Sequence, residues 1–196
     1  MKRWKGVLAA ATLGVSSQAW CNPEVSAFSE HDTILAIGDS LTAGAGVKRD
    51  ETYPALLSKR IAAKVIASGR NGETSAAMVA RLPRELKRAA SSFVILCSGG
   101  NDLLRSLSVA ELQSNLEQAI DLVREAGARP VLVAIPVPGT KQDHPVYRRV
   151  AQHKDVPVIE GIGALLGPEH FLRDGVHPNA AGYRVIVDEM MRFFGG

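Results

Sequence analysis

Two short patches far apart in the chain carry side chains that can perform covalent catalysis. The first is Gly-Asp-Ser-Leu at positions 38–41, and the second is Asp-Gly-Val-His-Pro at positions 174–178. In an activated-serine enzyme, serine attacks the substrate, histidine takes the serine proton, and aspartate orients the histidine. The patches therefore predict Ser40 as nucleophile, His177 as general base, and Asp174 as the group that orients His177.

Simpler interpretations of the same residues stay open at this point. A serine between a strand and a helical turn is a common helix N-cap. An aspartate three residues before a histidine often forms a surface ion pair. The same pair can also serve as zinc ligands, although no Cys or His nearby offers an obvious third ligand.

Two loops contain hydrogen-bond donors that suit acyl transfer, in which negative charge builds on a carbonyl oxygen. The loop at positions 68–74 contains glycine, whose backbone amide can approach a ligand closely because there is no side chain in the way. Asn101 offers a side-chain amide. Ordinary turn chemistry is an equally good explanation, because Asn and Gly are common in loops.

The elements that must position these residues alternate between strand and helix. Apolar runs rich in β-branched residues predict strands, and apolar residues at helical spacing predict helices between them. The predicted strands are Thr33–Ile37, Lys64–Ala67, Ser92–Leu96, Val131–Ile135 and Val156–Ile159. The predicted helices are Tyr53–Ala63, Thr74–Arg81 ending at Pro83, a further turn over Arg84–Ala90, a long helix from Val109 to Gly127, and a final helix beginning near Pro178.

This alternation predicts a parallel sheet covered by helices on both faces, which is a three-layer α/β domain. Ligands of such sheets bind beyond the carboxyl ends of the strands. Ser40 follows the first predicted strand and Asn101 follows the third. The sequence therefore predicts that both residues lie at the same edge of the sheet.

The first 19 residues have the pattern of a signal peptide. Lys2, Arg3 and Lys5 precede the apolar run 6–15, and Ser-Gln-Ala at positions 17–19 fits the small-x-small rule for cleavage. Cleavage after position 21 fits as well. We expect residues 1–19 to be the signal peptide, 20–31 a polar run-in, and 32–196 one hydrolase domain. An exported protein of this kind lies in the periplasm of a Gram-negative host and is otherwise secreted.

Charge and apolar length disfavour two classes of partner. The chain has 23 basic and 20 acidic residues, and three of the basic ones lie in the leader, so the remainder is formally neutral. We therefore expect no nucleic-acid partner. The apolar run 6–15 is about half a membrane span, so we expect no stable membrane span either. A disulfide between Cys21 and Cys97 is permitted by export but not demanded by the spacing.

Taken in order, the motifs resemble the SGNH, or GDSL, hydrolase superfamily. The resemblance rests on positions 38–41, Gly72, Gly-Gly-Asn-Asp at 99–102, and positions 174–177. The spacing and the residues of the motifs are most similar to those of the secreted bacterial thioesterase I/arylesterase/lysophospholipase group. Three further segments also resemble that group: Asp32–Ser40, Tyr53–Leu57 and Ala80–Pro83. The similarity covers roughly residues 32–193. Two segments depart from that group, namely 66–68 before the glycine loop and a shorter 138–157.

The resemblance implies a flavodoxin-like α/β/α sandwich with a parallel five-stranded sheet. It implies a catalytic triad of Ser40, Asp174 and His177, with an oxyanion hole made by the backbone N–H groups of Ser40 and Gly72 and by the Asn101 side chain. It implies a serine hydrolase of small-molecule esters or thioesters, with no metal or organic cofactor, and we expect the protein to be a monomer. Two alternatives remain: a carbohydrate O-acetylesterase on the same scaffold, and a non-catalytic binding protein that retains the fold.

Overall fold

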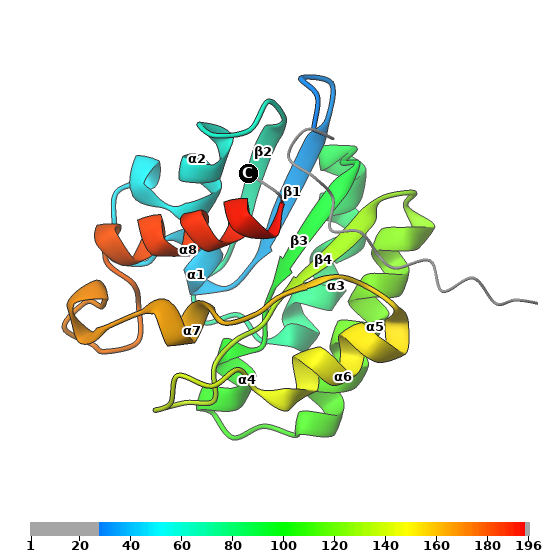
Figure 1. Cartoon of the computed structure of the whole chain (residues 1–196). Coiled ribbons are helices and arrows are strands. Elements are labelled where there is room, and N and C mark those ends of the chain that lie inside the picture. Colours follow the sequence, from blue (N-terminus) through cyan, green and yellow to red (C-terminus); the bar gives the residue numbers. More distant parts are fainter. Residues whose placement is uncertain (1–27, 195–196) are drawn as a thin grey trace, which may run out of the picture.

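Five parallel strands form the centre of the protein in the order β2-β1-β3-β4-β5. The computed structural model describes residues 28–194 (Figure 1). The strands are β1 (Thr33–Gly38), β2 (Lys64–Gly69), β3 (Phe93–Cys97), β4 (Arg129–Val133) and β5 (Val158–Ile159). The predicted parallel five-stranded sheet is confirmed.

The helices lie in two layers on opposite faces of the sheet, as Figure 1 shows. One face packs against α3 (Ser75–Ala89), α5 (Val109–Glu125) and α6 (Pro145–Lys154). The other packs against α2 (Tyr53–Ser58), α7 (Ile162–Leu165) and α8 (Ala180–Phe193). Successive strand residues face opposite layers, so Leu35 joins the first core and Ile34 the second. The predicted three-layer architecture is confirmed.

Short elements occupy the ends of the strands and the loops near them. Two short helices, α1 (Ser40–Ala43) and α4 (Gly100–Leu104), follow β1 and β3 closely. The 3₁₀ turns are η2 (Arg49–Glu51) and η3 (Pro168–His170). The register of β1 pairs Gly38 with Gly69 on one side and with Cys97 on the other, so three strands end level with one another. The loops that follow them therefore share one edge of the sheet.

The helix predicted to end before Pro83 instead continues through it. Helix α3 runs unbroken from Ser75 to Ala89 with Pro83 inside, and Pro83 is exposed. Proline lacks the N–H that would bond the carbonyl four residues earlier, and in a helix interior it costs about 3 kcal/mol. The buried apolar side chains on the opposite face, such as Met78, Leu82 and Leu86, offset this penalty by packing on the sheet.

The helix predicted over Tyr53–Ala63 is shorter than expected. Helix α2 ends at Ser58, and turns occupy positions 59–63. The N–H groups of Arg60 and Ile61 both donate to Leu57 O, at 2.9 and 3.2 Å, which ends the helix in turns, and Ile61 and Ala63 are buried while Ala62 between them is exposed. The backbone N–H of Lys64 then donates to Asp32 O at 3.0 Å, which begins the pairing of β2 with β1.

The predicted signal peptide, residues 1–19, lies outside the described residues, as does most of the run-in. Within residues 28–194, no helix combines the length and the apolar character that crossing a membrane requires.

Candidate active site

Ser40 is the first residue of α1, directly beyond the end of β1. Its neighbour Asp39 is the N-cap, because Asp39 Oδ1 accepts a hydrogen bond from the N–H of Leu41 at 3.0 Å. The serine side chain is therefore not used to cap the helix. This placement answers the simpler interpretation of Ser40 as an N-cap, since the capping is done by the preceding residue.

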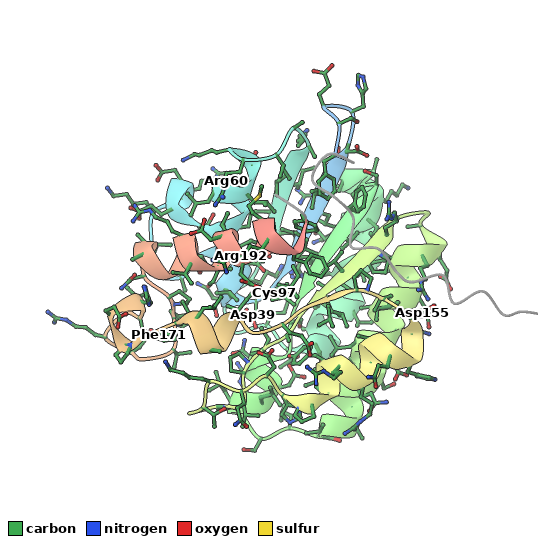
Figure 2. The ribbon with its side chains drawn as sticks, in the orientation of Figure 1. Asp39, Arg60, Cys97, Asp155, Phe171 and Arg192 are labelled. Carbon is green, nitrogen blue, oxygen red and sulfur yellow. The ribbon has the colours of Figure 1, made fainter. Side chains whose placement is uncertain are left out.

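The turn between β1 and α1 is packed against the end of β3. The Asp39 N–H donates to Cys97 O at 3.3 Å, and Figure 2 labels both residues near the middle of the molecule. A Cβ atom at Gly38 would lie 1.9 Å from Cys97 O, a distance no side chain can adopt. Glycine at 38 thus allows β1 to end against β3, and this contact helps to set where Ser40 begins.

Three side chains from opposite ends of the chain form one continuous hydrogen-bonded series. His177 Nε2 lies 2.9 Å from Ser40 Oγ, and His177 Nδ1 lies 2.7 Å from Asp174 Oδ2. With Nδ1 protonated toward Asp174, the free lone pair of Nε2 faces the serine hydroxyl. This is the arrangement a histidine needs in order to take a proton from serine.

Asp174 is held as a carboxylate by the turn that it shares with His177. The hydrogen bond from the His177 ring, together with those from the backbone N–H groups of His177 and Val176, lowers the pKa of Asp174 from 3.8 to about 2. Those two amides donate to Asp174 Oδ1 at 3.0 and 2.9 Å. The carboxylate therefore keeps its negative charge beside the imidazole throughout the neutral pH range.

Helix α8 anchors the loop that carries Asp174 and His177, called the histidine loop below, to the rest of the site. Asn179 caps α8, and its Nδ2 donates to Glu169 O at 2.7 Å and to Phe171 O at 3.2 Å. Four residues into α8, Tyr183 is fully buried and its hydroxyl donates to Leu41 O at 2.9 Å. These bonds tie the loop before α8 to the helix that begins with Ser40.

The predicted oxyanion donors on the other two loops are joined through Glu73. Asn101 Nδ2 donates to Glu73 O at 3.1 Å, and Glu73 directly follows Gly72 in the sequence. Gly72 has a φ of +73°, which favours glycine, and its carbonyl accepts a bond from Arg105 Nη2 at 2.9 Å. The Gly72 carbonyl is thus held by Arg105, while the loop around it is bonded to Asn101.

A buried carboxylate lies behind the serine. Asp39 is only 4% exposed, and burial raises its pKa to about 6, with Glu73 and Asp102 adding to the rise and the Leu41 N–H and His177 opposing it. Asp102 itself accepts bonds from Ser75 N at 2.9 Å and from Ser75 Oγ at 2.6 Å. Burial thus disfavours the ionised form of the carboxyl group next to Ser40.

Sequence reasoning gave no role to the buried charged residues of α3 and the loop before it. Glu73, Arg81 and Glu85 are all under 10% exposed. The signal was present, because Arg81 and Glu85 fall among the apolar positions that repeat at helical spacing on α3. Charged residues on the buried face of an amphipathic helix point to a specific partner.

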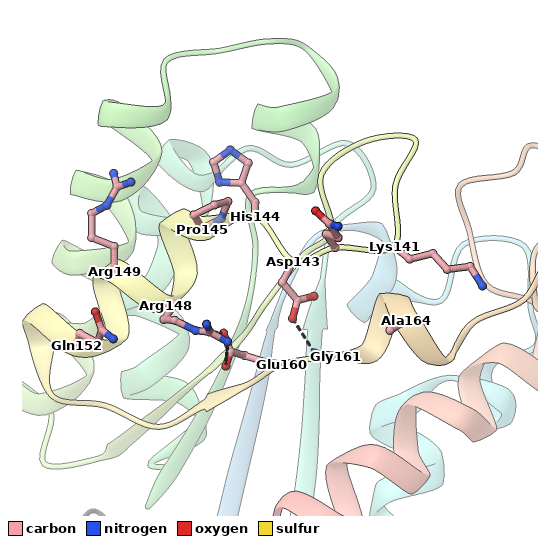
Figure 3. A pocket seen from close by; sticks show the side chains of 11 residues that line it. Lys141, Asp143, His144, Pro145, Arg148, Arg149, Gln152, Glu160, Gly161 and Ala164 are labelled. Carbon is pink, nitrogen blue, oxygen red and sulfur yellow. Dashed lines mark hydrogen bonds and ion pairs between the residues drawn. The ribbon is translucent and has the colours of Figure 1, made fainter.

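A hollow of about 570 Å³ lies between α6, the loop before it and the end of β5 (Figure 3). Most of the residues that line it are of polar type: Asp143 Oδ2 accepts the Gly161 N–H at 2.6 Å, and Arg148 forms a two-pronged pair with Glu160. None of Ser40, Asp174 and His177 lines it. Across residues 28–194, no cluster of three or more His, Cys, Asp or Glu side chains is arranged to hold a metal ion.

Comparison with known proteins defines the class. Residues 36–185 match the GDSL-like Lipase/Acylhydrolase family, and the chain belongs to that family. The matched range contains the serine, the glycine loop, the asparagine and the histidine loop described above.

Relatives and solved structures support the same class. The chain is 33% identical over 171 residues to "Thioesterase 1/protease 1/lysophospholipase L1" of Escherichia coli (strain K12), covering 82% of each chain. It is 33% identical over 173 residues to "Esterase TesA" of Pseudomonas aeruginosa, covering 81% of this chain and 85% of the relative. The crystal structure of TesA superposes with a TM-score of 0.76 at 29% identity, covering 83% of this chain and 97% of TesA. The chain is thus an SGNH-type enzyme that hydrolyses esters or thioesters.

Proposed function

We propose that hydrolysis proceeds through an acyl-enzyme on Ser40, with His177 as general base and then general acid, and Asp174 as the group that orients His177. The observation that carries this proposal is the series Ser40 Oγ–His177 Nε2–Asp174, with contacts of 2.9 and 2.7 Å. Both distances lie within the range over which protons are transferred.

In the first half-reaction, Ser40 Oγ bonds to the carbonyl carbon while its proton passes to His177 Nε2. The tetrahedral intermediate collapses when the bond to the leaving alcohol or thiol breaks, and His177 gives that group its proton. In the second half-reaction, water attacks the acyl carbon, its proton goes to His177 and then to Ser40, and the acid is released.

The negative oxygen of each intermediate is met by the N–H groups of Ser40 and Gly72 and by the Asn101 side chain. The left-handed Gly72 supports this assignment, because it lets the loop turn without a side chain beside the substrate. Asn101 supports it through its bond to Glu73 O, which uses one N–H of the amide and leaves the other for substrate. Such fixed donors act most strongly on charge that develops during the reaction.

The substrates in this proposal are carboxylic esters or thioesters of modest size, in the manner of an arylesterase, acyl thioesterase or lysophospholipase. The thioesterase/lysophospholipase of Escherichia coli and the esterase of Pseudomonas aeruginosa, to which the chain is similar, support this class. We also propose that residues 1–19 direct export and are removed. Mass spectrometry of the mature N-terminus from expressing cells tests this, and an intact residue 1 on the exported protein would contradict it.

The central experiment compares hydrolysis of p-nitrophenyl esters from acetyl to decanoyl, and of an acyl thioester, by the wild-type protein and Ser40→Ala. We expect kcat to fall on the order of a thousandfold or more, because the covalent step is lost. The exposed Ser58→Ala, at the end of α2, is the matched control and keeps full activity.

The outcome also separates the alternatives. Near-normal turnover by Ser40→Ala contradicts the nucleophile assignment. Activity confined to the acetyl ester, with release of acetate from acetylated sugars, indicates the O-acetylesterase instead. Failure of a fluorophosphonate to label Ser40, together with no turnover of any ester, indicates a binding protein that retains the fold.

A further inference from the structure

Arg81 occupies a position on α3 where an apolar side chain is expected. Its side chain is 6% exposed and lies on the same face as Met78 and Leu82, which pack in the core. A buried guanidinium is costly unless its charge and its N–H groups are all matched. The partners of Arg81 therefore show why a charge stands on this face.

Those partners belong to the two loops that carry the catalytic groups. Arg81 Nε and Nη2 donate to the two oxygens of Glu73 at 2.6 and 2.5 Å, forming a fork beside Gly72. Nη2 also donates to Gly38 O at 3.2 Å, two residues before Ser40. The Arg81 guanidinium thus contacts both the turn from Gly38 to Ser40, called the nucleophile turn, and the loop at positions 68–74, called the glycine loop.

The end of β2 completes the set. Arg81 Nη2 donates to Ser68 O at 2.9 Å, and Nη1 donates to Ser68 Oγ at 2.6 Å. Gly38 O receives a second bond from the Arg70 N–H at 3.0 Å, so both of its acceptor positions are used. The Ser68 hydroxyl lies at the end of β2, where it is a direct partner of Arg81.

The same network reaches the third oxyanion donor. Glu73 supplies its carboxylate to Arg81 and its backbone carbonyl to Asn101 Nδ2. Displacement of Glu73 therefore moves its neighbour Gly72 and releases the Asn101 amide. Ser40, Gly72 and Asn101 come from separate loops, and the Arg81–Glu73 pair is bonded to all three of those loops.

We propose that Arg81 is a positioning residue that holds the nucleophile turn and the glycine loop in the spacing that transition-state stabilisation requires. This inference rests on the proposed function, because it assigns Arg81 to the Ser40, Gly72 and Asn101 oxyanion hole. The shape of the guanidinium is essential, because its N–H groups point in several fixed directions and bond to Glu73, Gly38 O and Ser68 O together, whereas an ammonium is a single point of charge. Arg81→Lys keeps the positive charge but cannot hold the nucleophile turn and the glycine loop at the same distance from each other.

The proposal separates positioning from substrate binding. Arg81 is buried behind the loops, so its loss leaves the substrate contacts of the ground state in place. A displacement of about 1 Å in a catalytic group lowers turnover by about a hundredfold. We therefore expect Arg81→Lys to lower kcat by about tenfold to a hundredfold, with KM changed by less than about threefold.

The experiment measures kcat, KM and the thermal midpoint of the full-length protein and its variants. Arg60→Lys is the matched conservative control, because Arg60 pairs with Asp188 between α2 and α8 on the exposed surface. Val123→Ala removes buried volume from α5 and controls for lowered stability alone. Both controls are expected to keep kcat within about twofold of the wild-type value.

The second-order rate of Ser40 phosphonylation by a fluorophosphonate supplies a readout that a merely structural residue does not change. Its P=O group needs the same donors as an ester, so we expect the rate to fall in parallel with kcat/KM in Arg81→Lys. Wild-type protein that is not labelled at Ser40 contradicts the proposed function itself. Equal labelling of wild type and Arg81→Lys at Ser40 overturns only the role of Arg81.

If Arg81→Lys does not fold, Glu73→Gln tests the same positioning role. It keeps the size and one acceptor of the fork but removes the charge, so we expect kcat to fall by about threefold to tenfold with KM unchanged. A normal kcat with a lowered thermal midpoint overturns the proposal, as does an effect confined to KM.

Discussion

The two halves of the proposed active site are held in place in opposite ways. The nucleophile side, around Asp39, Glu73 and Arg81, is buried, and its hydrogen bonds include Asn101 to Glu73, 28 positions apart, and Arg81 to Gly38, 43 positions apart. The histidine side is open, with the side chain of Asp174 47% exposed and that of His177 28% exposed. The hydrogen bonds that Asp174 accepts there join residues only two or three positions apart.

The histidine side is therefore built by local contacts, whereas the nucleophile side depends on contacts between distant parts of the chain. The turn that holds His177 follows from one aspartate that accepts two backbone amides and the ring N–H. The nucleophile side needs β1, the end of β2, α3 and α4 to meet before its donors are in position. We therefore expect mutations in the histidine loop to alter chemistry with little effect on folding, and mutations on the nucleophile side to alter both.

The largest effect that tests this contrast is expected for Asp174→Asn. An amide can donate to Nδ1 of His177, which favours the tautomer with the proton on Nε2 and removes the base. We expect kcat to fall by about a thousandfold or more, while the thermal midpoint shifts little because the loop is exposed. Kinetics and thermal unfolding provide the measurements.

The control for that variant is Glu169→Gln, an exposed carboxylate in η3 that contacts neither Ser40 nor His177. Unchanged kinetics of Asp174→Asn would falsify the orienting role of Asp174. Loss of the folded state would instead show that the histidine loop is as much a part of the core as the nucleophile side.

A smaller effect is expected for Asn101→Ala, on the nucleophile side. The change removes one oxyanion donor, which typically lowers kcat by about a hundredfold to a thousandfold. It also removes the bond to Glu73 O, so the thermal midpoint is expected to fall as well. Gln113→Ala, which loses a bond to Glu117 within α5, is the amide control. A rise in KM with normal kcat would show that Asn101 only binds substrate.

The smallest effect concerns stability and pH at Asp39. Its pKa is raised from 3.8 to about 6, so the folded protein keeps this proton to a higher pH than the unfolded chain does. Unfolded chains then release protons first, and native stability decreases as pH rises from about 4 to about 6. The shift corresponds to a contribution on the order of 3 kcal/mol. The contribution is present below pH 4 and lost above pH 6.

Asp39→Asn is therefore expected to flatten the dependence of unfolding free energy on pH between 4 and 7, while Asn retains the helix cap. Urea titrations at pH 4.5 and 7.5 measure it, with the exposed Asp50→Asn as control. An unchanged difference between the two pH values would mean that Asp39 titrates normally. The nucleophile side would then be less shielded from water than its burial implies.

Several features of the fold could be predicted because they are local in sequence. Runs of β-branched residues indicated all five strands within a few residues, and the positions of Ser40 and Asn101 directly after two of them indicated that both lie at one edge of the sheet. The errors fell where packing overrides local preference. Pro83 is tolerated inside α3 because the opposite face of the helix is buried, and α2 ends early because Ile61 and Ala63 must both reach the core.

The proposed site likewise has features that are local in sequence and features that depend on packing. The sequence by itself determined which groups could act as nucleophile, base and orienting carboxylate, because chemistry demands particular residue types and Asp174 lies three residues from His177. Only the tertiary structure decided that Ser40 meets His177 across 137 residues, and that Arg81 joins the Gly38 and Glu73 loops. The physical reason is that a hydrogen bond between distant residues depends on how strands and helices pack, and no pattern within either segment specifies its partner.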